Sequence, residues 1–247
     1  MERIDISSQS ITDWSMILDS GRVDSPTRQY SLERLIRRYW PSLYAKARAG
    51  GMKPDEANDM VQGFMADILL ERNLTATADP ERGRFRGLLS TAFTNYLRDR
   101  HRAQHSKKRR PSDRTIRSLE RDFVQTTDDG QTDPEHMFNR HWVATVIQAA
   151  ISRVQVDFRE TGRHVEWRIL ECRLIAPLIS GATPTPYNAI VEDLDLRDVA
   201  QAASFLVNGK RALGRAILEE IGQTVTNPSE IEQEARELIE LLERKNA

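Results

Sequence analysis

Apolar side chains recur along this chain three or four residues apart, and the strict alternation typical of a half-buried strand is missing. The stretch from Pro54 to Leu74 shows the pattern well, because one face of a helix there would carry Ala57, Val61, Phe64, Met65, Ile68 and Leu69. Such spacing is typical of an amphipathic helix with one buried face. With 39% hydrophobic residues in a chain of 247, there is enough apolar material for packed helices. The sequence therefore predicts an all-α protein.

Glycine and proline mark where these helices begin and end. The first helix, from about Leu32 to Ala49, should end at Gly50-Gly51, and Pro54 with Asp55 and Glu56 opens the next one. Further helices are expected over residues 85 to beyond 102, 138–159, 164–179, 187–194, 198–221 and 228–244.

The polar segment TTDDGQTDP, residues 126–134, is typical of a solvated linker. We therefore expect two small helical domains joined by a flexible linker, the second with a helix-turn-helix. The divisions are an N-terminal extension at 1–29, a first domain at 30–117, a linker at 118–137, a second domain at 138–225 and an acidic C-terminal helix at 226–247. In the extension, Trp14, Ile17 and Leu18 form the only cluster that could dock.

Charge is distributed unevenly along the chain. Lys and Arg outnumber Asp and Glu by about six in residues 1–127 and are outnumbered by about seven afterwards. The basic excess lies mainly between Arg82 and Arg117, which indicates a local site for a polyanion. Cys172 is the only cysteine, so a disulfide within the chain is excluded, and no apolar stretch reaches membrane-spanning length. These features predict a cytoplasmic location and no membrane partner.

The first candidate site begins with GRFRG, at Gly83–Gly87, and continues along the helix behind it. Its side chains could track phosphates, and Thr91, Asn95 and Tyr96 could contact unpaired bases. The cations are Arg84, Arg86, Arg98, Arg100, Arg102, Lys107, Lys108, Arg109 and Arg110. A solvated basic face with no ligand would carry the same residues, and that alternative stays open.

The second candidate site is a short helix at 187–194 followed by a long helix at 198–221. This spacing suits a helix-turn-helix. One stripe of the long helix carries side chains of the kinds that contact base edges in a major groove, namely Gln201, Ser204, Asn208, Arg211 and Arg215. The polar outside of an ordinary amphipathic helix is the alternative.

Metal binding and catalysis find little support in the sequence. His101 and His105 have the spacing of two ligands on a helix, but no glutamate follows the first histidine and cations surround both. No nucleophile–base arrangement and no phosphate-binding glycine loop stands out. We expect no cofactor, no metal and no enzymatic activity.

Two segments carry a family resemblance. DEANDMVQGFMADILL (Asp55–Leu70) and GRFRGLLSTAFTNYLRDRHR (Gly83–Arg102) resemble the promoter-melting domain of extracytoplasmic-function (ECF) sigma factors, a group of the sigma-70 family. Residues 138–221 are similar to the helix-turn-helix domain of that family. There, Asp195 stands where glycine is frequent, and the long helix has an apolar first half with Ala202, Ala203, Phe205, Leu206 and Val207.

The resemblance implies a sigma factor that binds core RNA polymerase and promoter DNA, with an anti-sigma or other regulatory protein as a further partner. It assigns contacts with the clamp helices of the largest polymerase subunit to Asp59, Gln62 and Asp67. It assigns contacts with the −10 element to Asn95, Arg98, Asp99, Arg102, Lys107, Lys108, Arg109 and Arg110. Contacts with the −35 element fall to Gln201, Ser204, Asn208, Lys210, Arg211 and Arg215.

Two other functions fit the same sequence. The chain could be a free-standing helical regulator that binds DNA or RNA without polymerase. It could also be a protein–protein interaction module that uses the acidic C-terminal helix, where Ile231, Ala235, Leu238 and Leu242 form a narrow apolar seam. That seam could equally pack on its own domain.

Overall fold

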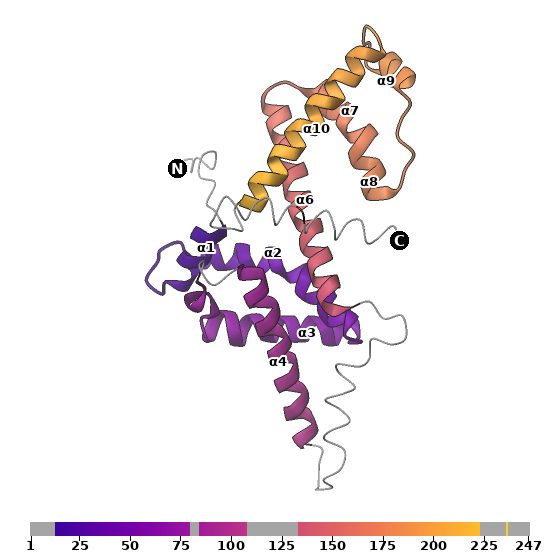
Figure 1. Cartoon of the computed structure of the whole chain (residues 1–247). Coiled ribbons are helices and arrows are strands. Elements are labelled where there is room, and N and C mark those ends of the chain that lie inside the picture. Colours follow the sequence, from indigo (N-terminus) through magenta and orange to yellow (C-terminus); the bar gives the residue numbers. More distant parts are fainter. Residues whose placement is uncertain (1–12, 80–83, 108–132, 223–235, 237–247) are drawn as a thin grey trace. The chain divides into compact units, whose positions relative to one another are not determined.

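The computed structural model describes residues 13–79, 84–107, 133–222 and 236 (Figure 1). Throughout this part of the chain the regular structure is helical and no strand is present. The predicted all-α class is therefore confirmed. The chain divides into two compact units, one formed by Met1–Thr145 with Gly222–Ala247 and the other by Val146–Ile221. We call them unit 1 and unit 2.

Among the described residues of unit 1 there are four α-helices, two shorter helical segments and the beginning of a further helix. In chain order they are α1 (Asp13–Gly21), α2 (Arg28–Ala49), α3 (Pro54–Phe64), the π-helical η1 (Met65–Glu71), the 3-10 helix η2 (Leu74–Thr77), α4 (Phe85–Lys107) and the first part of α6 (Pro134–Glu160). α1 packs against α2 and η2, and α2 packs against α3.

Local signals in the sequence set several of these boundaries. α2 ends at Ala49 as predicted, and Gly51 has a φ of 87°, a left-handed conformation that glycine adopts without strain. α3 begins at Pro54, and the backbone N–H of Lys53 donates to Glu56 at 3.1 Å. The acidic first turn thus satisfies a donor at the helix start that would otherwise lack a partner.

Aromatic side chains form the centre of unit 1. The Phe64 ring lies edge-on to Phe93 at 5.0 Å and to Tyr96 at 5.6 Å, and Phe85 meets Tyr39 at 5.7 Å. These rings join α2, α3 and α4, which explains why the apolar positions of all three helices face inward. In α1, Trp14 and Ile17 are buried and Leu18 is exposed.

The first part of α6 contributes to unit 1 as well. Phe138 and Trp142 are fully buried, the first beside the Lys46 amine and the second under the Arg86 guanidinium. The second domain was expected to begin at residue 138, whereas unit 1 extends to Thr145. Residues 134–137, expected within the linker, form the first turn of α6.

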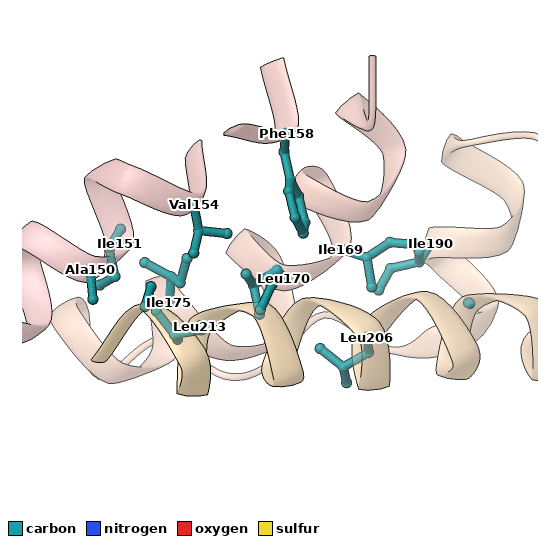
Figure 2. Packing of buried hydrophobic residues seen from close by; sticks show 13 residues of the cluster. Ala150, Ile151, Val154, Phe158, Ile169, Leu170, Ile175, Ile190, Leu206 and Leu213 are labelled. Carbon is teal, nitrogen blue, oxygen red and sulfur yellow. The ribbon is translucent and has the colours of Figure 1, made fainter. Parts of the chain in front are cut away.

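Unit 2 consists of the rest of α6, α7 (His164–Leu170), the π-helical η4 (Glu171–Ile175), α8 (Ala176–Ser180), α9 (Tyr187–Asp193) and α10 (Val199–Gly222). Figure 2 shows side chains of α6 and α7, among them Phe158, Ile169 and Leu170, gathered along α10. Arg153 of α6 donates to Glu220 of α10 at 2.7 Å, so this buried carboxylate has a cationic partner.

Some predictions concern residues outside the described part of the chain. These are residues 1–12 of the extension, residues 118–132 of the linker and the acidic C-terminal helix with its seam, where only Arg236 is described. Within the described residues, no helix is both long and apolar enough to cross a membrane.

Candidate nucleic-acid interface

The outward face of α4 carries a polar stripe made of residues from the first candidate site. Thr91, Asn95, Arg98 and Arg102 follow one another at intervals of three or four residues, and all four are exposed. Asp99 is exposed beside them. The opposite side of the helix is buried through Leu89, Phe93 and Leu97. α4 therefore presents amide, hydroxyl and guanidinium groups to solvent from a well-packed base.

Two residues proposed for the same interface, Tyr96 and Arg100, have partners within the chain. Tyr96 is only 8% exposed, so its ring is not available to stack on a base. Its hydroxyl donates to Asp67 at 3.3 Å, and the Arg100 guanidinium donates to the same carboxylate oxygen. Burial raises the pKa of the Tyr96 phenol, which keeps it a neutral donor. We call Asp67, Tyr96 and Arg100 the α4 clamp.

Asp67 therefore differs from the other residues assigned to polymerase contact. Asp59 and Gln62 are exposed on α3, and each presents its polar end to solvent. Asp67 is partly buried in η1 and is ion-paired with Arg100. Of these three residues, Asp67 is the one whose partner within the described part of the chain a binding protein would have to displace.

The guanidinium of Arg86, another member of the basic segment, lies over the Trp142 ring at 4.6 Å and donates to Asn139 at 2.6 Å. Arg86 thus attaches α4 to α6 by cation–π stacking and a hydrogen bond. This position makes Arg86 a packing residue, not a cation that lies along a phosphate track.

A buried lysine provides a second connection between these helices. The Lys46 amine of α2 donates to the Ser90 carbonyl of α4 at 3.2 Å and pairs with Glu135 at the start of α6. The Ser90 hydroxyl donates to Glu135 at 2.8 Å. These contacts join residues up to 89 positions apart in sequence, and sequence periodicity gave no sign of them.

The end of the basic segment is only partly described. α4 remains helical as far as Lys107, and Lys108, Arg109 and Arg110 lie outside the described residues. His101 is partly buried on α4. Among the described residues, no group of three or more His, Cys, Asp or Glu side chains is placed to hold a metal ion.

In unit 2, a tight turn joins α9 to α10. Asp195 has a φ of 49°, in the left-handed region, and the Leu196 N–H donates to the Val191 carbonyl at 3.0 Å. A left-handed residue after the helix followed by this return hydrogen bond is a Schellman ending. Val191 and Leu196 both pack against the core of unit 2, and apolar residues are common at these two positions of the motif. The short helix, tight turn and long helix therefore lie where the sequence expected them.

Gln201 has a structural role at the start of α10. The Asp198 carboxylate accepts from the Gln201 N–H at 2.7 Å, and the Gln201 side-chain oxygen accepts from the Arg197 N–H at 2.9 Å. The hydrogen bond from the Gln201 backbone lowers the pKa of Asp198. An N-cap aspartate followed three residues later by glutamine is a local signal that could have assigned this role from sequence.

The other residues proposed to contact a −35 element differ in exposure. Ser204, Lys210, Arg211 and Arg215 are exposed, and Asn208 is partly buried. Lys210 lies about 100° around the helix from Arg211, outside the stripe that Ser204, Arg211 and Arg215 share.

The charge near the start of α10 is unfavourable for DNA. Between Glu192 and Asp198 there are four carboxylates and one guanidinium, Arg197, and all five side chains belong to exposed residues. The cations of the stripe come later, and Arg211 lies about 18 Å along the axis from Val199 at the usual helical rise. A phosphate backbone would be repelled at the start of α10 and attracted near its middle.

Comparisons with protein-family models, with curated proteins and with solved structures find no match to this chain.

Proposed function

We propose that this protein is a bacterial transcription-initiation factor of the ECF sigma type, which binds core RNA polymerase and directs promoter recognition and DNA melting. The exposed stripe Asn95, Arg98 and Arg102 on α4 carries this proposal. It combines phosphate-binding cations with an amide that can hydrogen-bond to a base edge, on a helix whose other side is held by the core of unit 1.

The exposed face of α3 supports a protein partner. Asp59 and Gln62 are one turn apart and extend into solvent from a helix whose Val61 and Phe64 are buried. A rigid helix with an acid and an amide on its outside suits a basic partner surface. In the proposed complex this surface is the pair of clamp helices of the largest polymerase subunit.

The proposed role requires no catalytic activity of the chain itself. Duplex opening costs a few kcal/mol for each unstacked step, as in base-flipping proteins. Polymerase would hold both units on one DNA molecule, so that the second contact becomes intramolecular and gains affinity without new contacts. Bond formation would remain with polymerase, and the chain is proposed as a non-enzymatic, cytoplasmic factor.

Unit 2 has a smaller share in this proposal. Ser204, Arg211 and Arg215 are the residues of α10 that are exposed on one stripe and could approach a −35 element. The acidic residues at the start of α10 favour phosphate contacts near the middle of the helix over base reading by its first turns. We therefore expect a modest contribution of unit 2 to promoter choice.

The test is run-off transcription with purified core polymerase and a panel of promoter fragments. The wild-type chain should co-elute with core polymerase and yield open complexes. Asn95→Ala and Arg98→Ala should reduce open-complex formation more than polymerase association, because their side chains face DNA in the proposal. Arg140→Ala, which removes an exposed cation elsewhere in unit 1, is the charge-matched control.

Two outcomes would redirect the proposal. If the chain does not co-elute with core polymerase at low salt, the proposed sigma function is wrong. Salt-dependent binding of the free chain to DNA or RNA would then favour a free-standing regulator. Equal loss of association and opening in Arg98→Ala would mean that this face is structural. For unit 2, unchanged selectivity of Arg211→Ala among −35 variants would withdraw its promoter contact.

A further inference from the structure

We propose that Asp67 is a positioning residue for α4 and not a contact for polymerase. Its functional consequence rests on the proposed function, because it concerns the α4 stripe that is assigned to DNA. The clamp itself is defined by contacts within the free chain, so that its existence can be tested without polymerase.

The clamp brings a carboxylate of η1 to the back of α4. One oxygen of Asp67 accepts from both the Tyr96 hydroxyl and the Arg100 guanidinium, and that guanidinium lies over the Tyr96 ring at 5.0 Å. Tyr96 and Arg100 are one turn apart, whereas Arg98 and Arg102 occupy the other side of the helix. A clamp on one side thus sets the rotation of the side that carries the stripe.

Gly63 makes room for this arrangement. A Cβ atom built on Gly63 would lie 2.6 Å from the Tyr96 hydroxyl oxygen, closer than any real contact allows. The phenol can therefore reach Asp67 only because α3 has no side chain at that point. Gly63 thus leaves the space and Asp67, four residues later, provides the hydrogen-bond acceptor for the same residue, Tyr96.

The backbone around Asp67 is widened. The Arg72 N–H donates to the Asp67 carbonyl at 3.1 Å, an i to i−5 bond that belongs to the π-helical segment η1. Such segments interrupt regular α-helix and shift the direction of the side chains that follow. The regular pattern of α3, which places Asp59 and Gln62 outward, therefore does not extend to Asp67.

These contacts oppose a role in polymerase binding. A partner protein that used the Asp67 carboxylate would have to displace the Arg100 guanidinium and leave the Tyr96 hydroxyl without its acceptor. Asp59, which the family resemblance assigns to the same polymerase contact, is exposed on α3 and makes no such contact with the described residues. The two aspartates should therefore respond differently to the same substitution.

The experiment compares the single variants Asp67→Asn and Arg100→Asp with a double variant in which the two charges are exchanged, Asp67→Arg combined with Arg100→Asp. Asp59→Asn is the matched control. For Asp67→Asn we expect polymerase association within about twofold of wild type and open-complex formation reduced about two- to fivefold, the size expected for a partly exposed ion pair. The swap should restore opening to within about twofold of wild type. Asp59→Asn should instead weaken association.

Thermal unfolding of the free chain gives the independent readout. Each single substitution at Asp67 or Arg100 should lower Tm by about 1–4 °C, and the swap should recover most of that loss. Lack of recovery would overturn the clamp. Loss of polymerase association in Asp67→Asn that the swap does not restore would overturn the positioning role. If the wild-type protein fails to bind polymerase, the proposed function is wrong. The Tm values of the single and double variants still test whether the α4 clamp exists.

Discussion

α4 of unit 1 and α10 of unit 2 are both predicted to contact DNA through a polar stripe, and the two stripes differ in how far their residues are exposed. On α4 the residues Asn95, Arg98 and Arg102 are all exposed. On α10, Gln201 is engaged at the helix start and Asn208 is partly buried. A polar stripe at helical spacing thus shows which residues can face solvent, but not which have partners within the chain.

The electrostatic surroundings of the two helices differ as well. α4 begins within the basic GRFRG segment and is followed in sequence by further cations, whereas α10 follows Glu192, Asp193 and Asp195. Long-range repulsion from carboxylates acts against any phosphate contact nearby. Two helices with similar outward side chains are therefore unequal candidates for the same ligand.

The prediction with the largest expected effect tests whether residues 134–145 pack with α4 in unit 1. Trp142→Ala should destabilise unit 1 by about 3–5 kcal/mol, because it removes a fully buried ring that carries Arg86 on its face. Hydrogen exchange should accelerate in α2 and α4, while amides of α9 and α10 keep their protection.

Phe158→Ala is the matching change in unit 2, where this ring is also fully buried. It should release amides of α7 and α10 and leave α4 protected. If Trp142→Ala exposed α10 as strongly as α4, the division of the chain near Thr145 would be wrong.

A close approach of helices in unit 2 gives the next largest effect. A Cβ on Gly209 would lie 3.2 Å from the Leu170 Cβ, so that Gly209→Ala should destabilise unit 2 by about 1–3 kcal/mol in chemical denaturation. Gly214 has open space around it on the same helix. Gly214→Ala should therefore stabilise by about 0.5–1 kcal/mol through helix propensity. Similar values for both variants would contradict the packing of α10 on α7.

A substitution in the turn before α10 should give a smaller gain in stability. Asp195→Gly should raise the free energy of unfolding by about 0.5–1 kcal/mol, because glycine adopts a φ of 49° without the steric cost of a Cβ. Asp195→Val should destabilise at the same site. Asp195→Gly also removes a carboxylate near α10, so binding of this variant to DNA should improve slightly at low salt. A destabilised glycine variant would show that the Asp195 side chain holds the turn.

The smallest effect is a pH dependence at the start of α10. The hydrogen bond from the Gln201 N–H holds the pKa of Asp198 below its ordinary 3.8. The resulting stabilisation is complete above 3.8 and is lost as the pH falls through the lower folded pKa. Asp198→Asn should thus be less stable than wild type at about pH 7, and the difference should shrink as the pH falls below 3.8 through the folded pKa. A difference that does not change with pH would mean that the carboxylate charge plays no part in the cap.

Sequence alone determined the features that depend on neighbouring residues. The end of α2 at Gly50-Gly51, the start of α3 at Pro54 and the break at Asp195 between α9 and α10 follow from backbone preferences within a few residues. The exposed stripe on α4 follows from helical periodicity in the same way. These effects are local, so no knowledge of the fold was required.

Only the tertiary structure decided which polar residues have partners within the chain. Asp67 meets Arg100 across 33 positions, and Lys46 meets Glu135 across 89. Trp142, placed in the second domain from sequence, is buried in unit 1 beside Arg86. Contacts of this kind depend on which helices pack together, and that choice is made by the shape and charge of distant segments, which periodicity within one helix cannot report.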